Sequence, residues 1–150
     1  MDKKLTSSLE DYLEIIYNKI KENSKVKAID ISRELNVSRA SVTEALNKLA
    51  KNGLINYEKY GRIIITDEGI KKAKEIVFLH QELTNFFENL GIDSIEASEN
   101  ACKIEHIISN NIKKRIQDFN QFCKTNPEFK FWQKFIRLSY LIISPINVIF

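Results

Sequence analysis

Three amphipathic helical patterns followed by two short β-rich runs occupy the first 65 residues, and this order most constrains the fold. Apolar residues recur every three to four positions over Leu9–Ile20. Ser7 and Ser8 precede acidic residues in the arrangement that caps a helix. The pattern therefore predicts a first helix that begins beside these serines and ends at about Asn23.

The second and third helical patterns are short and are separated by a tight turn. The second covers residues 28–35 and is closed by Asn36, after which Ser38 offers an N-cap side chain. Apolar residues then lie on one face of a third predicted helix, over residues 39–52, and Gly53 supplies its C-terminal stop. Two helices joined by a tight turn are the core of a helix-turn-helix.

The chain changes character after the third helix. Residues 54–57 and 62–65 are short β-rich runs, and the segment between them ends in Gly61, which tolerates the positive φ of a hairpin loop. A helix-turn-helix followed by a two-stranded wing is the order of a winged helix-turn-helix. The sequence therefore predicts a domain of this kind, which binds double-stranded DNA.

Polar side chains follow the outward face of the third predicted helix and the hairpin. Hydroxyl and basic groups can contact phosphates and base edges in a major groove, and basic groups on a wing add salt-dependent affinity. Glu44 repels phosphates but can accept from a cytosine amino group. The alternative is a small α+β domain whose polar face is only solvated. The predicted DNA contacts are Ser38, Arg39, Ala40, Ser41, Thr43, Glu44, Lys48, Lys59 and Arg62.

The remainder of the chain is helical in pattern. A long helix is predicted from Thr66 to Gly91, a fifth from Asp93 or Ser94 to about Ile108, and a sixth over residues 112–123. The predicted fold class is mainly α, with an α+β winged helix at the N-terminal end and a helical domain after it. We expect a DNA-binding domain over residues 1–70, a helical domain over residues 71–124, and an apolar tail of unassigned role over residues 125–150.

Composition and charge set weaker limits. Lys plus Arg number 23 against 20 for Asp plus Glu, and a net charge of +3 does not by itself indicate a nucleic-acid partner. Residues 1–8 lack the apolar segment of a secretory signal, so we expect a cytoplasmic protein with Cys102 and Cys123 reduced. The apolar residues 138–150 are fewer than the roughly 20 that span a bilayer, so no membrane partner is expected.

Three kinds of metal donor lie within a stretch of five residues on the fifth predicted helix. Cys102, Glu105 and His106 stand at positions i, i+3 and i+4, so a helix places a thiol, a carboxylate and an imidazole on one face. A mixed sulfur, oxygen and nitrogen set can hold a first-row divalent metal. The sequence predicts a metal site here, to which another element must add a ligand. The alternative is a core thiol, a surface carboxylate and a half-buried histidine.

Two other segments carry donors beside apolar stripes. Asp11 and Glu14 are three residues apart on the first predicted helix, and His80 follows Ala73 and Val77 on one side of the fourth. These residues favour a metal site. Taken singly, an acid near a helix N-terminus is stabilised by the helix dipole, and a lone histidine beside an apolar face is ordinary.

Scattered motifs of the chain resemble one family of regulators. The runs Ser8–Tyr17, 57–60 and 65–69, together with His80 and the segment 101–106, resemble the DtxR/MntR metalloregulators in their order and separation. A helix-turn-helix alone would be shared with many unrelated regulators, so the resemblance depends on the combination.

The resemblance covers about residues 7–123 and implies a DNA-binding domain followed by a helical dimerisation domain. It implies a homodimer that binds a palindromic operator, activated by Mn²⁺ or Fe²⁺. The Cys-Pro-rich closing segment and the SH3-like third domain of other members are not expected here. The ligands implied by the resemblance are Asp11, Glu14, His80, Cys102, Glu105 and His106.

The implied ligand set combines two branches of the family. Asp11 and Glu14 match the manganese-type branch, whereas Cys102 falls where iron-type members carry cysteine and manganese-type members carry glutamate. Thr84 stands where many members place a carboxylate, so the resemblance implies an incomplete iron-type ancillary site. The residues therefore leave the choice between Mn²⁺ and Fe²⁺ open.

Three other interpretations stay open from the sequence. The first is a regulator of the same fold that responds to a small organic effector or to no ligand. The second is an enzyme with Cys102 as nucleophile and His106 as base, although no oxyanion hole or substrate cleft is indicated. The third is a structural zinc site from His80, Cys102, His106 and Cys123, whose spacing lacks short paired intervals. We expect a regulator that is not an enzyme and has no small organic substrate.

Overall fold

The computed structural model of the 150-residue chain describes residues 5–22, 26–57, 62–126 and 128–129. The chain divides into two compact units, residues 1–77 and 78–150. The predicted hairpin loop, with Lys59 and Gly61, lies outside the described residues, as does the apolar tail from residue 130. Among the described helices, none has both the length and the apolar character that crossing a membrane requires.

The first unit begins with α1 (Ser7–Lys21), which buries Tyr12, Leu13 and Ile16 against its neighbours. The N-cap is Thr6, whose hydroxyl accepts from the amide of Leu9, so the prediction that Ser7 and Ser8 cap this helix is wrong. Thr6 has the extended backbone that an N-cap requires, whereas both serines already belong to the first turn of the helix. The apolar periodicity located the helix correctly but did not select among three adjacent hydroxyl residues.

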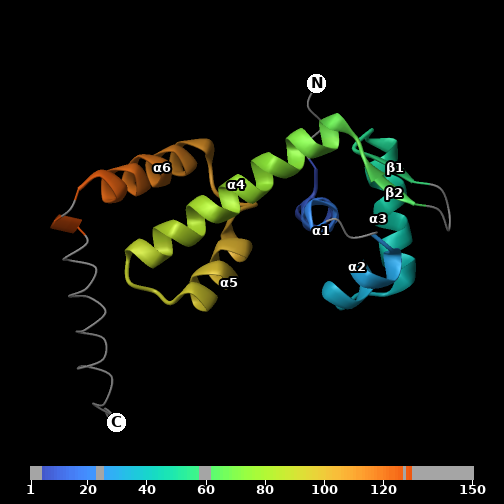
Figure 1. Ribbon diagram of the computed structural model, residues 1–150, viewed down its shortest axis with the longest axis horizontal. Helices are drawn as coiled ribbons and strands as arrows, with labels where there is room; N and C mark the ends of the chain where they lie inside the picture. Colours follow the sequence, from blue (N-terminus) through green and yellow to red (C-terminus); the bar gives the residue numbers. More distant parts are fainter. Residues whose placement is uncertain (1–4, 23–25, 58–61, 127, 130–150) are drawn as a thin grey trace, which may run out of the picture. The chain divides into compact units, whose positions relative to one another are not determined.

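The predicted helix-turn-helix is present as α2 (Ala28–Glu34) and α3 (Arg39–Lys51), seen on the right of Figure 1. Asn36 in the turn has a positive φ of 52°, and the Ser38 hydroxyl caps α3 by accepting from the Ser41 amide at 3.1 Å. The inner face of α3 contributes fully buried residues to one apolar core shared with α1 and α2. Burial of this face fixes which side of α3 remains outward.

The predicted wing is an antiparallel pair, β1 (Ile55–Tyr57) and β2 (Ile63–Ile65), with Ile55 opposite Ile65. Ile63 is buried and Ile64 is 55% exposed, as the alternation of a one-sided sheet requires. The sheet leads into the next helix at Gly69, where a Cβ would lie 2.0 Å from the carbonyl oxygen of Leu54. Only glycine allows this close approach, which joins the wing to the first turn of α4 (Asp67–Asn89).

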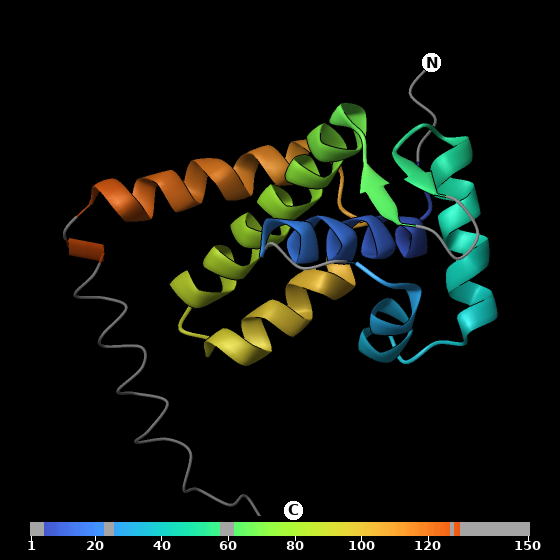
Figure 2. The ribbon, with the colours of Figure 1, turned by 45° about the vertical axis from the view of Figure 1, so that its right-hand side comes forward.

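The second unit contains the end of α4 (Asp67–Asn89), α5 (Ser94–Ile104) and α6 (Asn110–Thr125). Gly91, with φ at 93°, follows α4, and the side chains of Asp93 and Ser109 cap the two later helices. In Figure 2, α5 and α6 both lie against the C-terminal half of α4. One buried residue from each helix forms the centre of the core: Leu83, Ala101 and Ile116.

A buried polar contact also joins α6 to α4. Asn120 is 1% exposed, and its Nδ2 donates to the backbone oxygen of Glu82 at 2.8 Å and to Glu82 Oε2 at 2.9 Å. Its Oδ1 accepts from Asn89 Nδ2 at 3.0 Å. Since buried polar groups must be paired, this arrangement specifies how α6 docks on the helix that carries His80.

The fifth helix is shorter than predicted. It ends at Ile104 rather than at about Ile108, with Glu105 as its C-cap and a turn leading to the Ser109 cap of α6. The amides of Ile107 and Ile108 both bond to the carbonyl of Ile104, which tightens the chain into this turn. His106 therefore lies beyond the helix, and the predicted arrangement of three donors on one helical face is wrong for this residue.

Candidate metal centre and DNA-binding face

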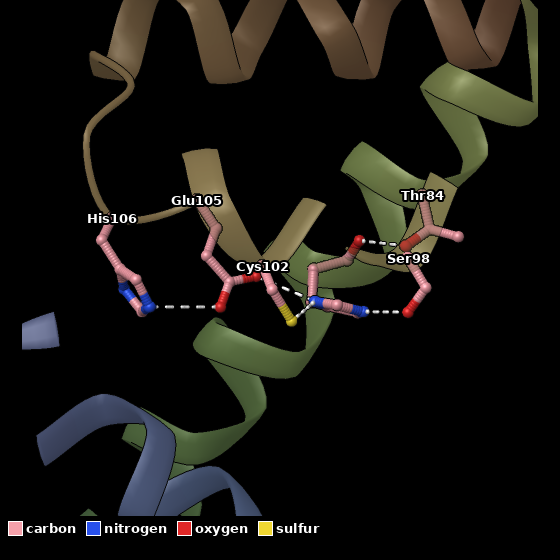
Figure 3. Close-up of polar contacts among 6 residues, drawn as sticks. Thr84, Ser98, Cys102, Glu105 and His106 are labelled. Carbon is pink, nitrogen blue, oxygen red and sulfur yellow. Dashed lines mark hydrogen bonds and ion pairs between the residues drawn. The ribbon is translucent and has the colours of Figure 1, made fainter. Parts of the chain in front are cut away.

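His80 is the centre of a polar cluster in the second unit. It projects from α4 with 19% of its side chain exposed, and both ring nitrogens face partners on the neighbouring segment. Its Nδ1 lies 2.9 Å from Glu105 Oε2 and 3.7 Å from Cys102 Sγ, and its Nε2 lies 3.2 Å from Ser98 Oγ. Figure 3 shows these contacts as dashed lines around the imidazole.

The carboxylate of Glu105 lies between two imidazoles. Oε2 faces His80 Nδ1, and Oε1 lies 3.4 Å from His106 Nε2 (Figure 3). The Glu105 side chain is only 3% exposed, and that of His106 is 11% exposed. A carboxylate removed from water needs polar partners, and here the two imidazoles supply them.

The donor set fits a transition metal. Nitrogen of His80, sulfur of Cys102 and oxygen of Glu105 lie within 4.8 Å of one another. Ligand atoms that each lie about 2.0–2.3 Å from one ion are roughly 3.0–3.7 Å apart when they occupy adjacent coordination positions. The 3.7 Å contact of Cys102 Sγ with His80 Nδ1 lies at the upper end of that spacing, and the 2.9 Å contact of Glu105 Oε2 is slightly shorter than it. Helix α4 and the C-terminal end of α5 thus bring soft and hard donors together.

The other two predicted ligands belong to the first unit. Asp11 and Glu14 are half-buried on α1 and are three residues apart, which places them on one side of that helix. Within the second unit, the structure brings together His80, Cys102 and Glu105, with His106 beside the last of these. Among the described residues, no group of close donors includes Cys123, so the structural zinc interpretation finds no support.

Two hydroxyl residues also contact His80. Thr84 donates to the backbone oxygen of His80 at 3.0 Å, one turn along α4, and thus satisfies itself within the helix. Ser98, which sequence reasoning missed, contacts the ring itself. The signal was available, because Ser98 precedes Cys102 by four residues and so shares its face of α5.

The two cysteines differ in environment, and both are free thiols. Cys102 is exposed beside His80, whereas Cys123 is buried on α6. Burial raises the pKa of the Cys123 thiol because the thiolate loses its hydration. Cys102 is therefore the more accessible sulfur for a metal or a reagent.

Comparison with known proteins identifies the family. Residues 4–63 match the iron dependent repressor family's N-terminal DNA binding domain, and residues 66–130 match its metal binding and dimerisation domain. An HTH-type transcriptional regulator of Methanocaldococcus jannaschii is 42% identical over 122 residues, which cover 80% of this chain and 98% of the relative. The chain belongs to the iron-dependent repressor family, that of the DtxR/MntR regulators.

Other members extend the comparison. The HTH-type transcriptional regulator MntR of Bacillus pumilus is 37% identical over 123 residues, 82% of this chain and 85% of that protein. A manganese-dependent transcriptional repressor solved in complex with manganese superposes with a TM-score of 0.70 at 29% identity, over 76% of this chain. The chain covers 53% of that solved protein, about half its length. The predicted winged helix followed by a helical dimerisation domain is confirmed.

The DNA-binding domain of this repressor family member presents most of the predicted contacts to solvent. Arg39, Ala40, Ser41 and Lys48 are exposed on α3, and Arg62 is exposed at the wing. The three predicted hydroxyl contacts already have partners: Ser38 caps the helix, its Oγ lies 2.9 Å from Ser41 Oγ, and Thr43 donates to the carbonyl of Arg39 at 2.9 Å. Their first role is therefore in shaping α3, and Lys59 lies outside the described residues.

Glu44 pairs with a predicted DNA contact. Its carboxylate lies 2.7 Å from Lys48 Nζ on the same exposed face of α3. The hydrogen bond and the positive charge of Lys48 lower the pKa of Glu44, so this carboxylate is ionised at neutral pH. The pair is solvated and adds little stability, but it neutralises one cation that would otherwise face phosphate.

Proposed function

We propose that the protein is a homodimeric repressor that binds operator DNA when Mn²⁺ or Fe²⁺ occupies a site built on His80, Cys102 and Glu105. The observation that carries the proposal is the mutual approach of these three donors, from α4, from α5 and from the C-cap of α5, in a chain of the iron-dependent repressor family. The family's two domain descriptions, DNA binding and metal binding with dimerisation, support both the partner and the assembly.

The remaining ligands in the proposal are His106, Asp11 and Glu14. The inclusion of His106 is supported by its contact with the carboxylate of Glu105, because the two oxygens of that carboxylate face His80 and His106. Asp11 and Glu14 are supported by their match to the ligand positions of the family's first helix and by their half-buried environment. A ligand set drawn from the DNA-binding and the helical domain couples metal occupancy to the freedom of the DNA-binding domain.

The switch follows from linkage between metal and DNA. His80 and Glu105 already lie in contact, and an ion held by them would supply positive charge beside the carboxylate. In the proposal, the carboxylates of Asp11 and Glu14 on α1 would hold the same ion. A ligand shifts a conformational equilibrium only by its differential affinity for the two states, so a few kcal/mol of coupling is enough. Two DNA-binding domains related by a two-fold axis fit a palindromic operator with half-sites roughly 10 bp, or a multiple, apart.

The donor chemistry allows both metals. The carboxylates of Asp11, Glu14 and Glu105 are hard ligands that suit Mn²⁺, whereas the thiol of Cys102 favours softer ions such as Fe²⁺. Affinity alone ranks Mn²⁺ below Fe²⁺, so selectivity for manganese requires geometry. We propose that the native protein responds to both ions.

We further propose that the protein acts in the cytoplasm and has no catalytic activity of its own. Membership of a family of transcriptional regulators supports both points. Such proteins act where the DNA is, and their role is to bind DNA rather than to catalyse a reaction. The cluster around His80 consists of metal donors and their hydrogen-bonding partners, and its most buried acid is held between two imidazoles.

The ligand variants test this function. Glu105→Ala and His106→Ala should abolish metal-stimulated operator binding, measured by fluorescence anisotropy with labelled promoter DNA, because each removes a donor at the coupling site. Glu99→Ala is the matched control, since Glu99 is an exposed carboxylate on α5. Circular dichroism and sedimentation should show folded dimers for all three variants. A full metal response in either ligand variant would refute the assignment.

A further inference from the structure

Ser98 contacts the ring of His80 from outside the proposed donor set. It lies on α5, four residues before Cys102 and half-buried, and its Oγ is 3.2 Å from Nε2 of His80. The opposite nitrogen, Nδ1, faces Glu105 and Cys102 at 2.9 and 3.7 Å. One edge of the imidazole therefore contacts a hydroxyl and the other contacts a carboxylate and a thiol, as Figure 3 shows.

We propose that Ser98 is a positioning residue that holds the imidazole of His80 with Nδ1 toward Glu105 and Cys102, so that Nδ1 is the nitrogen that binds the metal. This inference rests on the proposed function, since it specifies how one of the proposed ligands is presented. Residues that hydrogen-bond the far nitrogen of a histidine ligand fix both its ring orientation and its tautomer.

A hydroxyl suits this position because it can both donate and accept. The two contacts fit a ring whose Nδ1–H donates to the Glu105 carboxylate, with the hydroxyl of Ser98 donating to a bare Nε2 or accepting from Nε2–H. Metal binding requires an unprotonated Nδ1. With a metal on Nδ1, the Nδ1 proton would pass to solvent, a bare Nε2 would take a proton from solvent so that the ring stays neutral, and Ser98 would accept from Nε2–H. A carboxylate at this position would serve the second state only.

The surrounding contacts explain why the ring needs this partner. The carboxylate of Glu105 can accept a hydrogen bond from either ring nitrogen. A ring flipped by 180° could therefore present Nε2–H to Glu105 in place of Nδ1–H, so this contact alone does not select one orientation. Ser98 supplies the distinction, because its hydroxyl is fixed by α5 on the far edge of the imidazole. Thr84 cannot replace it, since its hydroxyl is engaged by the backbone oxygen of His80.

The test uses the full-length protein and reads the ring directly. The chain has two histidines, so long-range ¹H–¹⁵N correlation spectra contain only two imidazoles, and His106→Gln assigns them. In the metal-free native protein we expect the Nδ1–H tautomer for the neutral ring of His80. With Zn²⁺ as a diamagnetic probe, we expect coordination through Nδ1 and a protonated Nε2.

Three serine variants accompany the spectra. Ser98→Ala should give mixed tautomers in the metal-free protein and lower Zn²⁺ affinity by about 10- to 100-fold in a chelator competition, the range for lost outer partners of metal ligands. Ser98→Thr should restore both, because it keeps the hydroxyl. Ser94→Ala, which alters an exposed serine one turn earlier on α5, should change neither.

The outcomes separate this inference from the proposed function. Zn²⁺ bound through Nε2, or native tautomer and affinity in Ser98→Ala, would overturn the role of Ser98 while leaving the metal site intact. Failure of the native protein to bind Zn²⁺ would overturn the proposed function, and this inference with it.

Discussion

Replacing Asn120 with alanine should destabilise the helical unit far more than an ordinary change on α6. The native amide is 1% exposed and makes three hydrogen bonds, two to Glu82 and one to Asn89, at 2.8, 2.9 and 3.0 Å. The variant leaves the carboxylate of Glu82, which is 8% exposed, without its amide donor. A buried polar group that loses its partner costs about 1–3 kcal/mol and a charged one costs more, so we expect a loss of about 3 kcal/mol.

The assay is urea unfolding followed by circular dichroism in the presence of chelator, at one fixed protomer concentration because dimerisation contributes to stability. Gln121→Ala is the matched control, since Gln121 is the exposed neighbour on α6 and its loss should change stability by about 0.5 kcal/mol or less. In a Glu82→Gln background, Asn120→Ala should cost only about 1–2 kcal/mol, because the group left unpaired is then neutral. Equal costs for Asn120→Ala and Gln121→Ala would refute the reasoning.

Three shorter predictions concern the thiols and the DNA-binding face. Iodoacetamide at mildly alkaline pH should modify exposed Cys102 before Cys123, because the raised pKa of Cys123 leaves less of that thiol as thiolate. Saturating Zn²⁺ should protect Cys102, and mass spectrometry of peptides measures the labelling of both thiols. Unchanged labelling of Cys102 in the presence of metal would remove it from the ligand set. Cys102→Glu should shift the preference for activating metal toward Mn²⁺, measured as operator affinity against free Mn²⁺ and Fe²⁺ under anaerobic conditions, and an unchanged ratio of the two responses would contradict this. Glu44→Gln should strengthen binding to random-sequence DNA and steepen the salt dependence of that binding, because Lys48 is released from its ion pair. Weaker operator binding with unchanged affinity for random-sequence DNA would instead assign Glu44 to base recognition.

Local signals in the sequence were enough to locate the helices and the wing. Ser38 and Gly53 bracket α3 as predicted, because capping and a positive φ depend on neighbouring residues only. The alternation of buried and exposed isoleucines in β2 likewise follows from the strand period. Such features can be predicted because no distant contact decides them.

The features that were missed depend on tertiary contacts. The end of α5 at Ile104 has no local stop, since residues 103–108 contain neither glycine nor proline, and Glu105 turns instead toward His80 on another helix. Asn120 looks like an ordinary polar position of an amphipathic helix until Glu82 is placed beside it. Pattern and family resemblance together predicted a set of ligands but not their hydrogen-bonding partners. The spacing of Ser98 from Cys102 is compatible with a shared helix face, but only the geometry shows its contact with His80.

The central claim is that metal occupancy controls DNA binding, and one titration tests it most directly. Fluorescence anisotropy of promoter DNA should be measured with the native protein in chelator, and then in buffers of defined free Mn²⁺ and of defined free Fe²⁺ without oxygen. A few kcal/mol of coupling predicts affinity at saturating metal at least about 100-fold tighter than in chelator, because each 1.4 kcal/mol is a factor of ten. Equal affinity in chelator and in metal would contradict the account.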